Sequence, residues 1–247
     1  MGDQIAKALN PLLIDPATTE PYLRLPAPYE HLIVTPYRTS DATALVEHLN
    51  DLKVTMTLNG PPYPYLEQHA LGFLSDAISS SSLVIANLRA GKHPDGMPIR
   101  AIRDNTASDI ASAPLIGDCY IDRHGFGDMM NDKLEAERLA EENETKEAGN
   151  PTIIYTVGDW LASAYHRQGI MPAVLGALMK SWAIPRMGCT QMKVTAMLGN
   201  RASVRVFEKN GFKYVGDVPE VIPIMESKGG GRMGVHVVEW HLEDTEK

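Results

Sequence analysis

The period of the hydrophobic pattern changes twice between residues 152 and 198. Residues 152–161 and 191–198 are strand-like runs of apolar residues. Between them, apolar side chains recur at the spacing of one helix face: Met171, Val174, Leu175, Leu178, Met179 and Trp182. We expect this helix to end at Pro185, because proline lacks the amide hydrogen that a helix interior uses. The pattern therefore predicts a strand, a helix and a second strand.

A polar loop centred on Gly169 joins the first strand to the helix. Backbone N–H groups at a helix start have no partner in the helix, and together with the helix dipole they favour phosphate oxygens. Gly169 lets a ligand approach the backbone closely, and Pro172 is compatible with a first helical turn. A purely structural glycine turn is the commoner use of such a segment, so this loop alone leaves both interpretations open.

The rest of the chain also mixes strands with helices. We expect strands at residues 31–36, 82–89, 115–122, 212–216 and 235–242, and helices at 41–50 and 66–78. Asp41 is a plausible N-cap, residues 91–113 form a polar loop, and the glycines at 229–231 form a hairpin connection or a flexible loop. This order predicts an α/β (α+β) fold with a mixed, mostly antiparallel sheet flanked by helices.

Composition adds limits on class and location. With 247 residues, of which 44% are hydrophobic and 22% charged, the chain suits one domain over residues 29–247 after a lead-in over residues 1–28. No apolar run approaches the roughly 20 residues that span a bilayer, and the start lacks a signal-peptide pattern. We therefore expect a cytoplasmic or nuclear protein that is not secreted and has no membrane partner. The two cysteines are too few for a disulfide framework or a zinc site.

The net charge of −8 is concentrated in an acidic insertion at about residues 125–150. The acids are Asp128, Asp132, Glu135, Glu137, Glu141, Glu142, Glu144 and Glu147, against the bases Lys133, Arg138 and Lys146. Such a run is usually a solvated helix or a mobile insertion. The alternative is that it lines the approach to a site and attracts cationic amines. No basic patch with interleaved aromatic residues occurs, which argues against a nucleic-acid partner.

Two segments together resemble the GNAT acetyltransferase superfamily, in its RimJ/RimL-like branch. The family's pyrophosphate loop matches His166, Arg167, Gln168, Gly169, Ile170 and Met171. A later helix of the family matches Asn200, Ser203, Lys209, Gly211 and Phe212. Residues 31–50 and 59–73 look like the family's first strand and first two helices, so the resemblance covers roughly residues 30–218.

The resemblance implies a strongly twisted GNAT sheet whose central strands, ending at Leu161 and beginning near Gln191, splay apart around acetyl-CoA (coenzyme A). It implies these cofactor-binding residues: Trp160, Leu161, Ala162, His166, Arg167, Gln168, Gly169, Ile170, Met171, Asn200, Ser203, Phe207 and Lys209. The implied activity is the direct, metal-free transfer of an acetyl group to a primary amine. The acceptor would be a protein N-terminus or a small-molecule amine.

The catalytic base is where this chain departs from the family. Relatives often have a glutamate at a position that Tyr155 or Thr156 occupies here. Asp159 is the nearest ionisable substitute, with Asp118 on the preceding strand behind it, and a chain of water molecules could serve equally well.

The remaining site residues also come from the resemblance. The amide of Leu161 is the candidate oxyanion donor. Phe207 replaces a tyrosine that reprotonates the leaving thiolate in many relatives, so Ser203 or water would take that role. Tyr63 and Tyr65 are candidates for a substrate wall, although packing between helices explains them equally well.

The missing glutamate and tyrosine support a second hypothesis, a catalytically silent CoA-binding sensor or interaction module. Turnover on an amine separates this hypothesis from the enzyme. The sequence leaves the oligomeric state open between a monomer and a homodimer.

Overall fold

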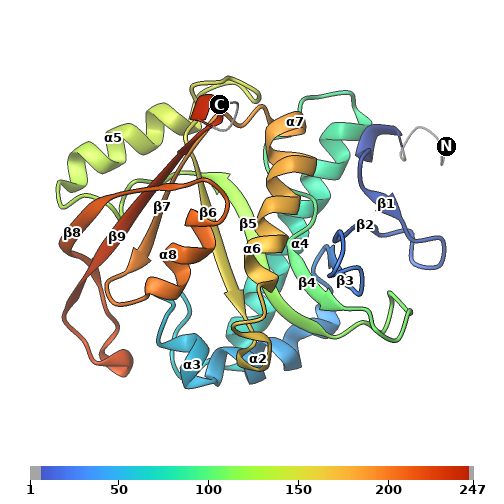
Figure 1. The fold of residues 1–247 in the computed structure, drawn as a ribbon, viewed down its shortest axis with the longest axis horizontal. Coiled ribbons are helices and arrows are strands. Elements are labelled where there is room, and N and C mark those ends of the chain that lie inside the picture. Colours follow the sequence, from blue (N-terminus) through green and yellow to red (C-terminus); the bar gives the residue numbers. More distant parts are fainter. Residues whose placement is uncertain (1–6, 245–247) are drawn as a thin grey trace.

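The computed structural model describes residues 7–244 and contains a nine-stranded sheet with the order β1-β2-β3-β4-β5-β6-β7-β9-β8 (Figure 1). The strands are β1 Leu13–Ile14, β2 Pro21–Arg24, β3 Leu32–Thr35, β4 Ala101–Asp104, β5 Leu115–Arg123, β6 Tyr155–Leu161, β7 Gln191–Met197, β8 Lys213–Pro223 and β9 Arg232–His241. The main helices are α2 Ala42–Asn50, α3 Leu52–Thr55, α4 Glu67–Arg89, α5 Lys133–Glu144, α6 Ile170–Leu178, α7 Ile184–Met187 and α8 Arg201–Glu208.

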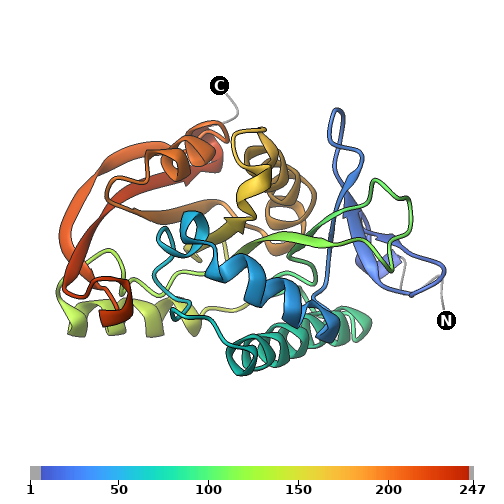
Figure 2. The ribbon, with the colours of Figure 1, turned by 90° about the horizontal axis from the view of Figure 1, so that it is seen from below.

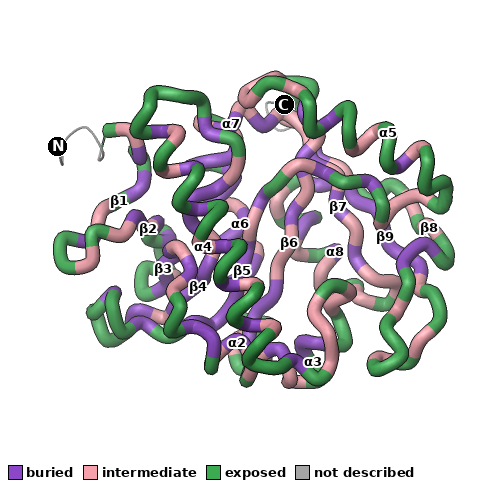
Figure 3. Tube along the Cα trace, turned by 180° about the vertical axis from the view of Figure 1, so that it is seen from behind, coloured by how far each residue is buried: buried purple, intermediate pink, exposed green. Residues whose placement is uncertain are grey.

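Helices cover both faces of this sheet. Figure 2 shows α2, α3, α4 and α5 on one side of the strands and α6, α7 and α8 on the other. Buried residues follow the strands and the inner faces of these helices (Figure 3), and the largest cluster joins α6 to β5, β6 and β7. The predicted α/β fold with a mostly antiparallel sheet flanked by helices is confirmed.

The central strands β6 and β7 diverge. They are the sheet's parallel neighbours, and they pair at a single position, Tyr155 with Met192. Every other pair of adjacent strands in the sheet is antiparallel. From Tyr155 onward the two strands separate, so the predicted splay of the central strands is present.

The prediction of a strand at residues 82–89 is wrong, because these residues form the last third of α4. A serine-rich stretch interrupts the apolar pattern here, but Ala77, Ser81, Val84 and Leu88 continue one buried helix face. The hydroxyl of Ser81 donates to the Pro98 carbonyl at 2.6 Å, so this polar residue is satisfied within the core. By length and composition alone α4 could cross a membrane, but core helices of soluble proteins meet the same test.

Pro185 does not end the helix that begins at Ile170. The turn Met179–Ala183 is π-helical, and the Ile184 amide donates to the Met179 carbonyl, five residues back. This wider turn accommodates the missing amide hydrogen of Pro185, and the helix runs on through α7 to Met187. Gly188, in the left-handed region with a φ of 68°, ends it.

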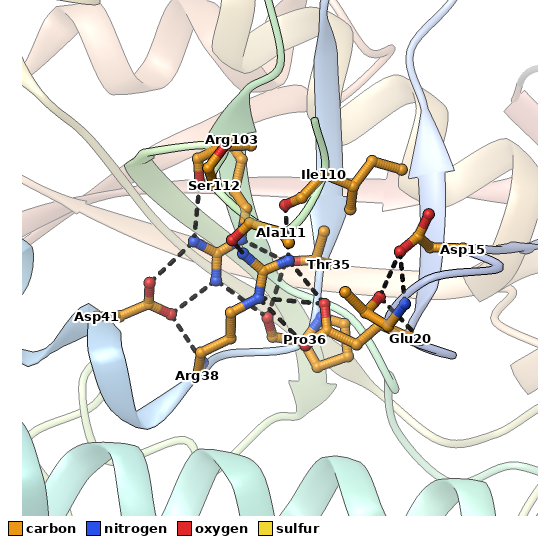
Figure 4. A network of polar contacts seen from close by, with 12 residues as sticks. Asp15, Glu20, Thr35, Pro36, Arg38, Asp41, Arg103, Ile110, Ala111 and Ser112 are labelled. Atoms are coloured by element: carbon orange, nitrogen blue, oxygen red, sulfur yellow. Dashed lines mark hydrogen bonds and ion pairs between the residues drawn. The ribbon is translucent and has the colours of Figure 1, made fainter. Parts of the chain in front are cut away.

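The expected loop over residues 91–113 contains β4, which the sequence analysis missed. The hydrophobic pattern did not predict this strand, because Arg103 within it is charged and yet only 1% exposed. Figure 4 shows its guanidinium against Asp41, which accepts from it at 2.8 and 2.7 Å. Asp41 stands at the N-cap of α2, but its carboxylate binds Arg103 and makes no cap hydrogen bond to that helix.

The chain before residue 28 adds β1 and β2 to the sheet. Arg38 holds this edge, because its guanidinium donates to both carboxylate oxygens of Glu20 and to the carbonyls of Ile110 and Ala111 (Figure 4). At the opposite edge, residues 229–231 lie in the connection between β8 and β9, so the predicted hairpin connection is confirmed.

The acidic insertion contains α5, which bears out the helical form expected for it. Asp132 caps this helix by accepting from the Glu135 amide at 3.1 Å. Buried Asn143 fastens its other end to the strand that follows, since its side chain donates to the Ile154 carbonyl at 2.7 Å and accepts from the Ile154 amide at 2.9 Å. The C-terminal end of this exposed helix is therefore anchored to the segment that leads into β6.

Candidate functional site

A cavity of about 960 Å³ opens where β6 and β7 separate. Both strands, the loop before α6, the first turns of α8 and the segment from α3 to residue 59 line it. The predicted residues that line it are Asp159, Trp160, Leu161, His166, Arg167, Gly169, Ile170, Met171, Asn200, Ser203 and Lys209. The structure thus brings most of the predicted cofactor residues to one cavity.

The loop before α6 has the backbone of an anion-binding turn. Gly169 is the N-cap of α6 with a φ of 76°, and Arg167 also has a positive φ, of 63°. The amides of Ile170 and Met171 follow directly at the helix start, where intrahelical partners are missing. The side chain of Met171 is buried in the core, so it does not cover this start. The loop can therefore offer consecutive N–H groups to a phosphate.

Two tyrosines outside the loop fix its position. The hydroxyl of Tyr29 donates to the Gln168 carbonyl at 2.8 Å, and that of Tyr165 donates to Asp104 at 3.0 Å. Because the C=O and N–H of a trans peptide point in opposite directions, the Tyr29 bond directs the Gly169 amide away from Tyr29. A Cβ on Gly169 would stand 2.6 Å from the Tyr29 hydroxyl, so a larger residue here would displace this hydroxyl from the loop.

The register of β6 turns particular backbone groups toward the cavity. The Ala162 amide donates to the Ile116 carbonyl of the neighbouring chain segment at 2.8 Å. Hydrogen-bonded positions alternate along an antiparallel pair, so the amides of Leu161 and Asp159 face away from β5 and into the gap. The Leu161 carbonyl is already occupied, because Nε2 of His166 donates to it at 2.8 Å. The Leu161 amide remains available to a ligand.

Asp159 is a half-buried carboxylate in this gap. Within residues 7–244 no hydrogen bond or ion pair to its side chain is found. Burial, and secondarily the negative charge of Asp118, raise the pKa of Asp159 to about 7. A carboxyl group with this pKa exchanges a proton readily near neutral pH.

Helix α8 supplies the opposite wall. The Asn200 side-chain oxygen accepts from the Ser203 amide at 3.2 Å and caps the helix, so its amide nitrogen keeps both hydrogens for other partners. Ser203 lines the cavity one turn above this cap. Arg205 and Lys209, four residues apart, reach the same cavity from the helix face behind it. With Arg167 from the loop, they make this end of the cavity positively charged.

Several predicted residues lie outside the cavity lining. Tyr155 is 1% exposed, and its hydroxyl donates to the Met187 carbonyl at 3.3 Å. Phe207 packs in the core against Phe212, with ring centroids 5.3 Å apart. Ala162 is buried with its amide bonded, and the exposed side chain of Gln168 donates to the Ala164 carbonyl.

The predicted substrate residues also lie outside it. Asp118 is buried and receives two hydrogen bonds from Arg100, at 2.8 and 2.6 Å. Tyr65 packs within the core between α2 and α4, and half-buried Tyr63 precedes it. The interhelical packing that the sequence left open for the tyrosines describes Tyr65.

The cavity contains polar residues that the sequence analysis missed. They are Lys53, Thr57, Asn59, Tyr120, Tyr165, Thr195 and Arg205, together with Asp128 and Thr156, which the sequence analysis named without placing them in a cavity. Arg205 had a usable signal, its four-residue spacing from Lys209. Asp128 belongs to the acidic insertion, for which the sequence left open that it lines the approach to a site, but nothing in the run distinguished Asp128 from the other acids. Cys119 and Cys189 are buried thiols, and within the described residues no group of three potential ligands could hold a metal ion.

Comparison with known families agrees with this geometry. The model of the GNAT acetyltransferase domain matches residues 31–213, which is most of the chain. The chain therefore belongs to the GNAT acetyltransferase family, as the resemblance predicted. A comparison with curated proteins finds no match.

Solved structures of acetyltransferases share the fold. RimL, a ribosomal-protein acetyltransferase solved in complex with coenzyme A, has a TM-score of 0.57 and 15% identity over 87% of this chain and 96% of that chain. Mycobacterium smegmatis RimJ, solved with CoA-disulfide, has a TM-score of 0.55 and 18% identity over 92% and 89%. The ribosomal-protein-S5-alanine acetyltransferase from Vibrio fischeri has a TM-score of 0.57 and 15% identity over 87% and 96%. At these identities the likeness concerns the fold.

Proposed function

We propose that this protein is an acetyl-CoA-dependent N-acetyltransferase that acts on a primary amine. The observation that carries the proposal is the gap between β6 and β7, which leads from the phosphate-type loop at Gly169 to the unpartnered carboxylate of Asp159. Family membership supports an acetyltransferase, and the solved relatives RimL and RimJ hold coenzyme A or its disulfide.

The residues present fit coenzyme A. Its diphosphate would lie on the amides of the loop around Gly169, near the positive charges of Arg167, Arg205 and Lys209. Its pantetheine arm would run along β6 and past the amide of Asn200, and the Leu161 amide would be left for the thioester carbonyl. This arrangement would bring the thioester into the gap.

The thioester supplies an activated acetyl group, and the chain's residues must handle protons and charge. The amine nitrogen forms a bond to the carbonyl carbon, the carbon–sulfur bond breaks, and the thiolate takes up a proton. Asp159 takes the proton that the amine loses, and its pKa of about 7 suits this role at neutral pH. The Leu161 amide stabilises the oxyanion, and the Ser203 hydroxyl relays a proton to the thiolate, giving up its own hydrogen and taking one back from water.

Release of free coenzyme A from acetyl-CoA, measured with a panel of small amines and peptide N-termini, tests this function. We expect thiol release that depends on an amine, with an acetylated amine identified by mass spectrometry. Binding of coenzyme A without turnover on any amine would favour the alternative, a silent CoA-binding sensor, and would reject the enzyme.

A further inference from the structure

A second carboxylate reaches the cavity from the acidic insertion. Asp128 follows β5 in the loop that leads to α5, and it lines the cavity with a side chain that is 44% exposed. Its Oδ2 accepts a hydrogen bond from the hydroxyl of Thr195, which belongs to β7. The insertion is thereby tied across the gap, and this carboxylate is held in a fixed place.

The charge of Asp128 is not neutralised by its neighbours. Its one ion-pair contact within residues 7–244 is buried His124, whose Nε2 lies 3.9 Å from Oδ1. Nδ1 of His124 accepts from the Phe126 amide at 2.7 Å, and burial lowers the pKa of His124, so the imidazole is neutral at neutral pH. The nearby cation Lys193 is paired with Glu239 at 2.7 Å.

The cationic side chains that line the cavity lie away from Asp128 or next to other partners. Arg167, Arg205 and Lys209 lie on the loop and on α8, where the phosphates of coenzyme A are proposed to bind. Lys53 stands at the start of α3, where its positive charge acts on the neighbouring carboxylate of Asp51. Asp128 therefore faces the cavity as a carboxylate whose preferred partner, a cation, is not supplied by the described residues.

Asp128 and Asp159 cannot both act on the reacting amine nitrogen. A fixed anion beside the reacting nitrogen stabilises its protonated form, and a protonated amine does not attack a thioester. An anion that does not take the reacting proton helps only if it binds a different positive charge of the acceptor. Since Asp159 is proposed to take the proton, Asp128 is left for such a charge.

We propose that Asp128 binds a second cationic group of the acceptor, so that the cleft selects amines carrying a further positive charge. This inference rests on the proposed function. The acceptors selected in this way have a primary amine and a second ammonium or guanidinium group near it. Its source would be a diamine or a peptide whose N-terminus precedes a basic residue.

Calorimetry on the protein saturated with coenzyme A tests the inference without turnover. Butylamine is compared with putrescine, and the alanine tripeptide with Ala-Lys-Ala. We expect the dicationic member of at least one pair to bind about tenfold more tightly, as is usual for a hydrogen bond to a charged group. The pair that shows this preference identifies the source of the charge.

Three variants test whether Asp128 causes the preference for dicationic amines. Asp128→Asn should reduce it to about twofold or less, while Thr195→Val, which keeps the charge and removes its tether, should reduce it partly. Glu137→Gln makes the same change of charge on the exposed face of α5 and should retain it. The affinity for coenzyme A should stay unchanged in all three.

The inference is overturned if neither dicationic amine is preferred, or if Asp128→Asn keeps the preference. It is also overturned if Asp128→Asn abolishes turnover of butylamine and putrescine equally while their binding is unchanged, because Asp128 would then act on the proton. Failure of the proposed function looks different: no amine is acetylated, whatever the binding preference.

Discussion

Buried Asp41 at the start of α2 and half-buried Asp159 on β6 are two carboxylates with opposite surroundings. Asp41, which is 5% exposed, receives two hydrogen bonds from Arg103 and one from the Arg38 amide (Figure 4). Asp159 receives none from the residues that the structure describes, and its pKa rises to about 7. The comparison separates a charge that holds the start of α2 to β4 from a charge that is free to exchange a proton.

The largest expected effect concerns the paired carboxylate. Arg103→Ala leaves Asp41 buried without its cation, and breaking a buried pair costs about 3–5 kcal/mol. We expect the free energy of unfolding, measured by urea denaturation, to fall by that amount. Arg138→Ala is the control, because its pairs with Glu135 and Glu142 are exposed. If both variants unfold alike, the pair of Arg103 with Asp41 does not stabilise the fold.

The unpaired carboxylate should affect stability in a pH-dependent way. Because the pKa of Asp159 is raised from 3.8 to about 7, the folded state holds a proton that the unfolded state loses between these values. The buried charge of Asp159 therefore lowers the free energy of unfolding. This destabilisation is absent at low pH and fully present above about pH 7, where it reaches at most about 4 kcal/mol.

Asp159→Asn removes this cost. We therefore expect the variant to be more stable than the wild type at about pH 8, by roughly 2–4 kcal/mol, and to lose most of that advantage at about pH 4. Denaturation of both proteins at the two pH values measures the difference. An advantage that is the same at both would show that Asp159 titrates normally.

Gly158, next to Asp159 on β6, tests how tightly this strand packs against Tyr120 of β5. A Cβ there would stand 2.2 Å from the ring of Tyr120, and the guanidinium of Arg100 lies 3.9 Å from the centroid of that ring. We expect Gly158→Ala to lower the free energy of unfolding by about 1–3 kcal/mol through overpacking. Gly216→Ala places the same methyl group in open space on β8 and serves as the control. Equal losses would mean that the ring moves aside freely.

The smallest expected effect comes from the loop tether. Tyr29→Phe removes a hydrogen bond worth about 1 kcal/mol, so the KM for acetyl-CoA should rise about fivefold with kcat unchanged. The KM for acetyl-pantetheine, which lacks the diphosphate, should not change. A rise for both thioesters would mean that Tyr29 acts on the fold in general and not on the phosphate loop.

Local features of the site were predictable from the sequence. The loop around Gly169 depends on neighbouring residues, since a helix start and a left-handed glycine are both local. Long-range features were not. Tyr29 and Gln168 are 139 residues apart, and Asp128 and Thr195 are 67 apart, so no spacing rule connects them.

The errors in the fold have similar causes. Strand β4 was missed because its buried Arg103 needs Asp41, which lies 62 residues away. The continuation of the helix past Pro185 was missed because a π-helical turn, which no sequence pattern predicts, accommodates the proline. Tyr155 was placed correctly on β6, but the face on which it lies depends on the packing against Met187.

The central claim is that the carboxylate in the gap between β6 and β7 takes part in acetyl transfer. Asp159→Asn tests it most directly, with thiol release and coenzyme A affinity measured on the same preparation. The account predicts that kcat/KM for the amine falls by about 10²–10⁴-fold, while the Kd for coenzyme A stays within about twofold. A variant that keeps its turnover while binding coenzyme A normally would contradict it.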